Sequence, residues 1–595
     1  MSTIVESAPV DSTPFWFGPT ERPLFGWLHL PEDHQVRGGV VLCQPLGIEA
    51  SCVYYSYRLL ADQLAAQGVA VLRYDYDGTG DSFGNETDPD RVETWLSSVT
   101  VATEYLVGIG VDSVGLVGVR MGALFAAHEA SRRSDVDVLV LWDPCLSGRA
   151  FLREQRFLRQ MSGEGGPAGD DAVEAPGIRI ERETVKTLSD LDLTRMAGDF
   201  APRILTLVPP EVSRPKALER RLDGLNVEWQ EATGQVALLD SAKQVPPYET
   251  IDRITSWLSD AFTGQPVPVV PPRPTTAAVG RTSSGDEIIE HMVTLGDLRL
   301  FGIVTEGPDT GGRPTVVLVN EGGTHHIGQA RIWVDLARWL AALDFRVLRF
   351  DLSGNGDSDP RPGQIPHVAR AFEAIEDVRT AVRAIAPVDP SDVVLIGFCS
   401  GAYQVVEQAL SDPPQGICII NPTFSFEPAE PAGSAFRPAR QVPKHWFVAA
   451  TTPALRLLGR RRNPDELKRW IKAVEVGTRT AALARRHPGI PEYVWFPINR
   501  FLFERQGITT LERIVGSGVD TMLIVGPHDL LPLSLGATGQ MQALRQDPRF
   551  RLLQLDELEH ASWSLEQRRL MISVISEHLT ATFGGPRSHR PPGRP

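Results

Sequence analysis

The sequence predicts two tandem α/β domains, each a doubly wound, mostly parallel sheet with a helical cap insertion. Three observations predict this fold. A helix-then-strand pattern at residues 59–75 occurs again at 335–351, an offset of 276 residues. The same loop, Asp-x-x-Gly-x-Gly-Asp-Ser, follows both copies. Each half also contains a Gly-x-x-x-Gly turn between an apolar strand and a helix. A match this long at one offset indicates tandem duplication.

A chain of 595 residues is too long for one hydrophobic core, so we expect more than one domain. The repeat indicates where the domain boundaries lie. We place the first domain at 1–263 and the second at 289–582. The Pro-, Gly- and Ser-rich stretch 264–288 is predicted to be a linker, and 583–595 a disordered basic tail. Within each half, apolar strands alternate with helices, which predicts parallel strands joined by right-handed crossovers.

A long insertion at about 421–520 of the second half is predicted to be a cap over the active site. It contains several aromatic side chains, which would line an acyl pocket or pack within the cap. Its basic stretches, 460–462 and 468–469, would receive an acidic acyl carrier protein or coenzyme A phosphates, or form a solvated helix face.

Composition excludes several classes of function. The net charge of −15 argues against binding of nucleic acid. Five cysteines without a CxxC pair indicate free thiols in a reducing compartment. Neither a signal peptide nor an apolar run of membrane-spanning length is present, so we expect a cytoplasmic protein without a membrane span. The glycine loops do not complete a nucleotide-binding motif, and we expect no cofactor and no metal.

The candidate nucleophile is the central residue of the glycine-flanked turn. In the second half, Cys399 stands between Gly397 and Gly401, at the corner where a strained elbow would expose it. A buried structural thiol is the alternative reading of Cys399. Ser400 is a rival hydroxyl, but one residue past the corner its backbone N–H is better suited to stabilise an oxyanion.

The acid and the base are expected after the last two strands. Asp529 follows an apolar strand at 521–526, and His560 follows another at 551–555, so the order is nucleophile, acid, histidine. His560 would take the thiol proton and Asp529 would orient its imidazole. His528 is an alternative base.

The oxyanion hole would pair the amide of Ser400 with one in the glycine-containing loop at 320–326, supplied by Glu321 or Gly322.

The first half lacks all three groups. Arg120 stands at the elbow, and a guanidinium cannot attack a carbonyl carbon. No Asp stands at the aligned acid position, and Gln235 occupies the position of the histidine. We therefore interpret the first half as a pseudoenzyme that serves as a scaffold, a lid or a docking surface.

The elbows, the glycine loops and the order of Cys399, Asp529 and His560 resemble those of the α/β-hydrolase superfamily. The stretches at 22–31, 71–84 and 147–161 make the first half similar to the serine aminopeptidase-like hydrolases associated with exosortase systems. Those relatives carry Ser at the elbow, where Arg120 stands here. The Gly-Phe-Cys-Ser-Gly elbow of the second half is similar to that of dienelactone hydrolases.

Cysteine at the elbow favours thioester chemistry, because its acyl-enzyme is close in energy to coenzyme A or carrier-protein thioesters. We predict an acyltransferase or cyclase acting on a small-molecule acyl ester or thioester, with an acyl carrier protein or coenzyme A as partner. An ester, thioester or lactone hydrolase with the same triad is the first alternative. A non-catalytic scaffold or binding protein is the second. The sequence leaves open whether the protein forms a homo-oligomer.

Overall fold

The structure is a computed structural model, and it describes most of the two sheets and their helices. The described residues are 10–162, 171–240, 244–310, 312–321, 323–364, 366–367, 373–422, 507–526, 539–555, 558 and 564–584.

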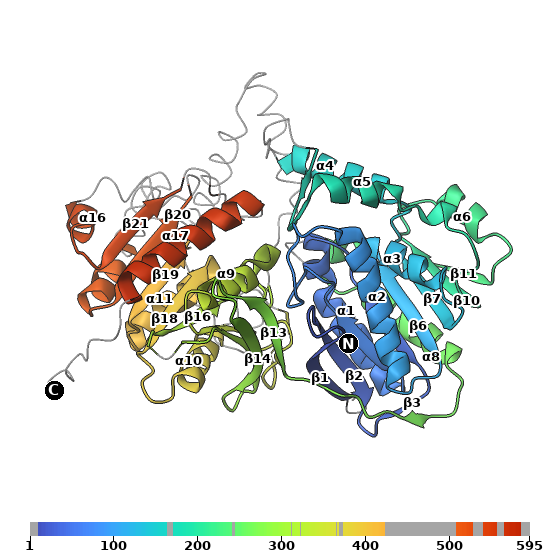
Figure 1. The fold of residues 1–595 in the computed structure, drawn as a ribbon, viewed down its shortest axis with the longest axis horizontal. Coiled ribbons are helices and arrows are strands. Elements are labelled where there is room, and N and C mark those ends of the chain that lie inside the picture. The colour runs from blue at the N-terminus through green and yellow to red at the C-terminus, as the bar shows by residue number, and fades with distance from the viewer. Residues whose placement is uncertain are drawn as a thin grey trace, which may run out of the picture.

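The first half is built on an eight-stranded sheet (Figure 1). Its strands lie in the order β1 (Val10–Phe17), β2 (Leu24–Pro31), β5 (Ala70–Tyr74), β4 (Gly39–Cys43), β6 (Val114–Val119), β7 (Val136–Trp142), β10 (Arg203–Val208) and β11 (Val227–Glu231). The crossover and terminal helices are α1 (Ile48–Ala66), α2 (Arg91–Gly108), α3 (Met121–Ala130), α6 (Lys216–Leu222), α7 (Gln235–Leu238) and α8 (Tyr248–Ala261). A small cap between β7 and β10 consists of α4 (Gly148–Ser162), β8 (Val173–Ala175), β9 (Ile178–Ile180), α5 (Arg182–Asp190) and η1 (Leu193–Arg195).

The second half is built on a nine-stranded sheet. Its strands lie in the order β13 (Thr276–Arg281), β14 (Glu287–Leu295), β15 (Leu300–Glu306), β17 (Val347–Phe350), β16 (Thr315–Val319), β18 (Val393–Phe398), β19 (Gly416–Ile420), β20 (Asp520–Val525) and β21 (Phe550–Gln554). Its helical elements are η2 (Gln329–Arg331), α9 (Ile332–Ala341), α10 (Ala374–Ile385), α11 (Ser400–Ser411), α16 (Gly539–Leu544) and α17 (Leu565–Phe583). Most of the predicted cap lies outside the described residues.

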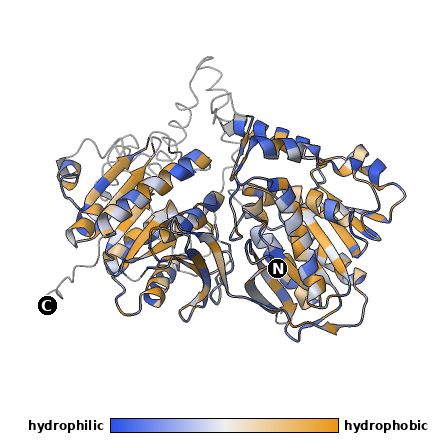
Figure 2. Ribbon diagram, in the orientation of Figure 1, coloured by the Kyte–Doolittle hydropathy of each residue, from blue (hydrophilic) through white to orange (hydrophobic). Residues whose placement is uncertain are grey.

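The two sheets share one strand order, apart from the additional edge strand β13. In each, the strands from β4 or β16 onward are parallel, and the N-terminal strands are antiparallel. The parallel strands are almost continuously apolar because helices cover both faces. Figure 2 shows this apolar character concentrated on the central strands. The predicted fold class is confirmed.

The segment predicted as a linker is partly built into the fold. β12 (Val267–Pro268) pairs with β3 (Gln35–Val36), on the first half. β13 extends the second sheet by pairing with β14. Part of the predicted linker therefore contributes a strand to the second sheet.

The two halves pack directly against each other along their N-terminal strands. The ring of Trp27, on β2, meets that of Phe301, on β15, at 5.0 Å in an edge-to-face arrangement. These rings belong to one apolar cluster to which both halves contribute. The chain is therefore an intramolecular pair of similar domains, with β2 and β15 at the contact.

Candidate active site

The elbow of the second half has the strained geometry that the sequence predicts. Cys399 follows β18 directly and precedes α11, with φ 51° and ψ −109°, a backbone conformation that costs a non-glycine residue energy. Its backbone N–H donates to the carbonyl of Ile420, at 3.0 Å. Cys399 is partly exposed, whereas the other four cysteines are buried. The elbow thus presents one accessible thiol.

The two flanking glycines allow this turn to pack closely. A Cβ on Gly397 would lie 2.5 Å from the backbone of Gly401. A Cβ on Gly401 would lie 2.5 Å from the carbonyl oxygen of Val319 and 2.7 Å from that of Asn320. Backbone atoms cannot move aside cheaply, so both positions require glycine. The second contact also shows that the loop after β16 lies against the elbow.

This arrangement brings together the described parts of the predicted oxyanion hole. Ser400 is the first residue of α11, so its N–H belongs to the positive end of a helix. Asn320 holds the neighbouring loop by donating from Nδ2 to the carbonyl of Phe350, at 2.8 Å. Glu321 is buried beside it, and burial raises the pKa of its carboxyl to about 8. Its side chain is therefore mostly protonated at neutral pH. Gly322 lies outside the described residues.

The predicted acid and base, Asp529 and His560, lie outside the described residues, as does His528. The strands that precede them are present: β20 and β21 are parallel to each other and to β19 beside the elbow strand. The carboxyl ends of parallel strands meet at one edge of a sheet. Gly526, just after β20, donates its N–H to Oδ1 of Asn421, at 2.9 Å.

The first half keeps the turn but not the nucleophile. Arg120 has φ 55° and ψ −117°, close to the values at Cys399. Gly122 is as tightly packed as its counterpart, because a Cβ there would lie 2.1 Å from the carbonyl oxygen of Cys43. The strained backbone is therefore independent of any chemistry at its corner.

Ion pairs fill the equivalent site of the first half. Arg120 contacts Glu49 at 3.3 Å, Asp143 at 3.6 Å and Glu154, on α4 of the cap, at 2.6 Å. Gln235, at the position of the histidine, donates from Nε2 to Oδ2 of Asp143 at 3.1 Å. Burial raises the pKa of Glu49 to about 7 despite Arg120 beside it. Two side chains at the triad positions of the first half, Arg120 and Gln235, are therefore paired with carboxylates, and Arg120 also binds the cap through Glu154.

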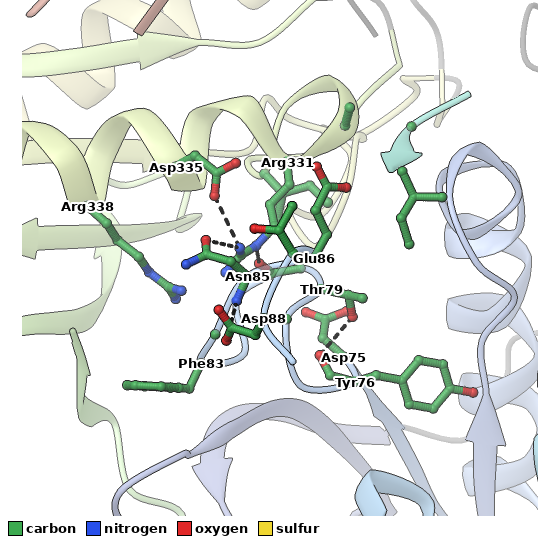
Figure 3. A pocket seen from close by; sticks show the side chains of 18 of the residues that line it. Asp75, Tyr76, Thr79, Phe83, Asn85, Glu86, Asp88, Arg331, Asp335 and Arg338 are labelled. Atoms are coloured by element: carbon green, nitrogen blue, oxygen red, sulfur yellow. Dashed lines mark hydrogen bonds and ion pairs between the residues drawn. The ribbon is translucent and has the colours of Figure 1, made fainter. Parts of the chain in front are cut away.

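A large cavity lined by described residues lies between the halves. Figure 3 shows its wall, with Asp75, Tyr76 and Phe83 from the first half facing Arg331 and Arg338 from the second. Cys399 is not among its lining residues.

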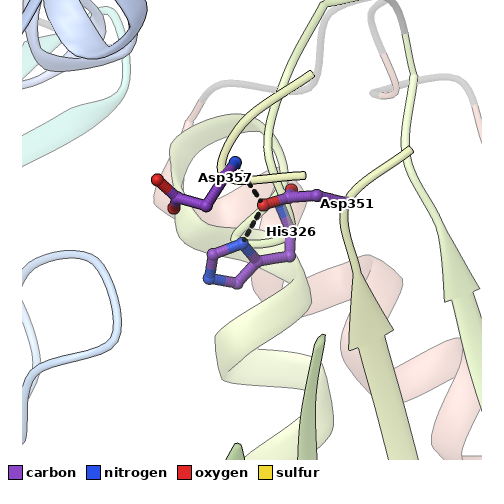
Figure 4. A group of neighbouring side chains, drawn as sticks. All are labelled: His326, Asp351 and Asp357. Carbon is purple, nitrogen blue, oxygen red and sulfur yellow. Dashed lines mark hydrogen bonds and ion pairs between the residues drawn. The ribbon is translucent and has the colours of Figure 1, made fainter. Parts of the chain in front are cut away.

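A buried polar cluster at the same interface was missed by the sequence analysis. Both ring nitrogens of His326 bind carboxylates. Nε2 lies 2.7 Å from Asp81 of the first half. Nδ1 binds Asp351 at 3.0 Å, and Figure 4 shows this pair. Burial lowers the pKa of His326, but these two carboxylates outweigh burial and raise it well above its ordinary value. His326, Asp351 and Asp357 lie close enough to hold a metal ion. With both nitrogens engaged, however, His326 acts as a cation.

Two buried ion pairs join the halves, and each half supplies the arginine of one pair and the aspartate of the other. Arg73 of the first half lies 2.9 Å from Asp357 of the second, and Arg349 of the second binds Asp81 of the first. At the offset of 276 residues, Arg349 is the counterpart of Arg73 and Asp357 that of Asp81. All four side chains are almost fully buried. We call these two pairs, together with His326, the interdomain clamp.

Comparisons with known proteins find α/β-hydrolase sequence in both halves. The model described as "Alpha/beta hydrolase family" matches residues 316–572, and "Serine aminopeptidase, S33" matches 34–167. Each half therefore contains an α/β-hydrolase domain. The likenesses to exosortase-associated and dienelactone hydrolases stay predictions. No curated protein matches.

Several solved structures are similar in fold to part of the chain. An esterase from Pyrococcus furiosus is 16% identical, with 43% of this chain and 92% of that one covered and a TM-score of 0.30. A proline iminopeptidase from Mycobacterium smegmatis is 15% identical, with 42% and 98% covered and a TM-score of 0.31. The Est1E protein of Butyrivibrio proteoclasticus, bound to ferulic acid, is 14% identical, with 41% and 96% covered and a TM-score of 0.31. No helix among the described residues is both long and apolar enough to cross a membrane.

Proposed function

We propose that the second half catalyses acyl transfer through a covalent acyl-enzyme on Cys399. The observation that carries the proposal is the elbow itself: an accessible thiol on a strained corner, at the N-terminus of α11 and beside the loop that follows β16. A nucleophile there can meet a carbonyl carbon while helix amides face the oxygen.

In the proposed reaction, Sγ of Cys399 attacks the acyl carbon and the thiol proton passes to His560, which Asp529 orients. The backbone N–H of Ser400 and one from the 320–322 loop would stabilise the oxyanion. Collapse expels the thiol or alcohol, which takes the proton from His560. A second nucleophile then attacks the thioester and releases Cys399. Water as that nucleophile gives hydrolysis, whereas a hydroxyl or amine gives transfer or, on the same chain, cyclisation.

Thioesters of coenzyme A or of an acyl carrier protein are the proposed donors, because exchange between two thioesters is nearly balanced in energy. Hydrolysis of an ester, thioester or lactone is the second candidate, favoured by the hydrolase descriptions of both matching family models. The ion pairs of Arg120 support the proposal that the first half contributes no chemistry of its own.

Intact-mass spectrometry after incubation with acyl-coenzyme A thioesters tests the proposal. We expect one acyl group on the full chain, none on Cys399→Ala, and an unchanged yield on the control Cys52→Ala, whose thiol is buried on α1. Product analysis with and without an added alcohol or amine decides between transfer and hydrolysis. Iodoacetamide should label Cys399 before the four buried cysteines. A chain that neither acylates nor reacts with iodoacetamide at Cys399 would instead be a scaffold.

A further inference from the structure

The interface cavity has a volume of about 1340 Å³. Ligand pockets typically measure about 300–1,000 Å³, so this space is ample for a small molecule. The first half contributes the loop after β5 and the first turns of α1, and the second contributes α9, α17 and the β13–β14 hairpin. The cavity is therefore a product of the association of the two halves.

The equivalent space on the other side of the interface is closed. There a cavity of only about 10 Å³ remains, and the ring of His367 stacks on that of Tyr55 at 5.0 Å and 4°. At the offset of 276 residues, the counterparts of these two residues are Arg91 and Arg331, which both line the open cavity. Arg91 is held by Asp77 and Arg331 by Asp335, at 2.8 and 3.1 Å. Arg331 also crosses the interface to donate to the carbonyls of Gly80 and Ser82, and the space beside these two arginines stays open.

Much of the cavity wall is apolar. Both halves contribute aliphatic or aromatic side chains to it: Leu46, Ile48, Phe83, Ile178, Ile327 and Ile572. A hydrocarbon chain that covers this wall removes apolar surface from water, which favours binding.

One end of the cavity is suited to an anion. Arg568 and Arg569 stand near the N-terminus of α17 and line the cavity. Nη1 of Arg568 donates to the carbonyl of Ala330 at 2.9 Å and lies 3.7 Å from Asp335, and Nη2 binds Glu86. Its buried Nε has no hydrogen-bond partner among the described residues. Arg569 is exposed, and among the described carboxylates none pairs with it.

The N-terminus of α17 adds a positive backbone potential at this end of the cavity. A helix N-terminus attracts negative charge, and the carboxylate of Glu174, from the first half, already accepts the N–H of Leu565 at 2.8 Å. A buried arginine, an exposed arginine and a helix N-terminus thus lie together at the cavity.

We propose that the interface cavity binds an acyl chain with an anionic end, a carboxylate or a phosphate. The chain lies along the apolar wall and the anion lies against Arg568 and Arg569. This inference goes beyond the proposed function, because binding requires no reaction at Cys399. A ligand held by both halves also stabilises their association, since it binds only the assembled interface.

Calorimetric titration of the full-length Cys399→Ala protein tests the inference without turnover. The probes are dodecanoate, dodecyl phosphate, dodecanol and dodecylamine, each below its critical micelle concentration. We expect dodecanoate or dodecyl phosphate to bind at one site and to raise the melting temperature, with the alcohol and the amine at least about tenfold weaker. The stronger of the two anions identifies the head group. Equal affinity for all four probes would overturn the anionic end.

Two further variants, made in the same background, locate the site. Arg569→Gln should weaken anion binding about tenfold, whereas Arg195→Gln, on the exposed surface of the cap, should not. Ala50→Trp, at the cavity wall, should abolish binding, whereas Ala581→Trp, exposed on α17, should leave it intact. Melting temperatures verify that each variant is folded. Binding that survives both Arg569→Gln and Ala50→Trp would overturn the proposal, and acylation of the wild-type chain is measured separately.

Discussion

Replacing Arg73 by Met should destabilise the protein by about 3–5 kcal/mol, the usual cost of leaving one partner of a buried ion pair uncompensated. Its side chain is 3% exposed and that of Asp357 is 1% exposed, so water cannot take over the contact. Two unit charges about 4 Å apart attract by about 4 kcal/mol at an effective dielectric constant of about 20. Asp357 keeps the hydrogen bond from Tyr54, which favours the lower half of the range.

Urea unfolding followed by tryptophan fluorescence and circular dichroism measures this loss. Asp357→Leu alone should cost a similar amount, but the double variant Arg73→Met/Asp357→Leu should recover most of it, because an apolar pair leaves no buried charge. The exposed pair Arg253–Glu249 is the control, and Arg253→Met should cost under about 1 kcal/mol. If Arg73→Met cost as little as the control, or if the single losses simply added in the double variant, the clamp would not be the coupled buried pair described here.

Three other variants make separate predictions. Gly401→Ala should slow labelling of Cys399 by iodoacetamide at least about tenfold, because its Cβ would meet two backbone oxygens at 2.5 and 2.7 Å. The control Gly108→Ala, which has open space around it, should leave the labelling rate unchanged. An unchanged rate in both variants would contradict the close packing at Gly401. Glu321→Gln should retain acyl-transfer activity above about pH 8, whereas the wild type should lose activity there because the ionised carboxylate of Glu321 opposes the negative charge of the oxyanion. Superimposable pH profiles of the two proteins would exclude this effect. Asp75→Asn should become more stable relative to the wild type between about pH 4 and pH 7. Burial raises the pKa of Asp75 to about 7, so the folded wild type retains a proton that the unfolded chain releases, and its stability falls across that window by up to about 4 kcal/mol. A constant difference between pH 4 and pH 7 would refute it.

The sequence predicted the parts of the fold that depend on local pattern. Apolar runs of strand length, glycines around a corner and a repeat at one offset are all readable along the chain, and the elbow at Cys399 follows from them. The loop after β16 was also expected beside the elbow, because parallel strands bring their ends to one edge.

The interface could not be predicted in the same way, because its contacts join residues far apart in sequence. Asp81 and Asp357 belong to the two Asp-x-x-Gly-x-Gly-Asp-Ser loops, and their partners Arg349 and Arg73 stand within strands. One signal was present: an arginine at the same register of an otherwise apolar strand in both halves. A charge is rarely buried without a partner, so this repetition could have indicated a shared polar interface.

The interdomain clamp also constrains how the chain is made. Synthesis proceeds from the N-terminus, so Arg73 and Asp81 leave the ribosome before the residues that neutralise them, Asp357 and Arg349, which lie 284 and 268 positions later. At about 5–20 residues per second, these intervals last roughly 13–57 s. Throughout it, the first half must expose to water the face that later becomes the interior of the assembled protein. Until the second half is made, Arg73 and Asp81 must be hydrated, because a charge without a partner is costly away from water.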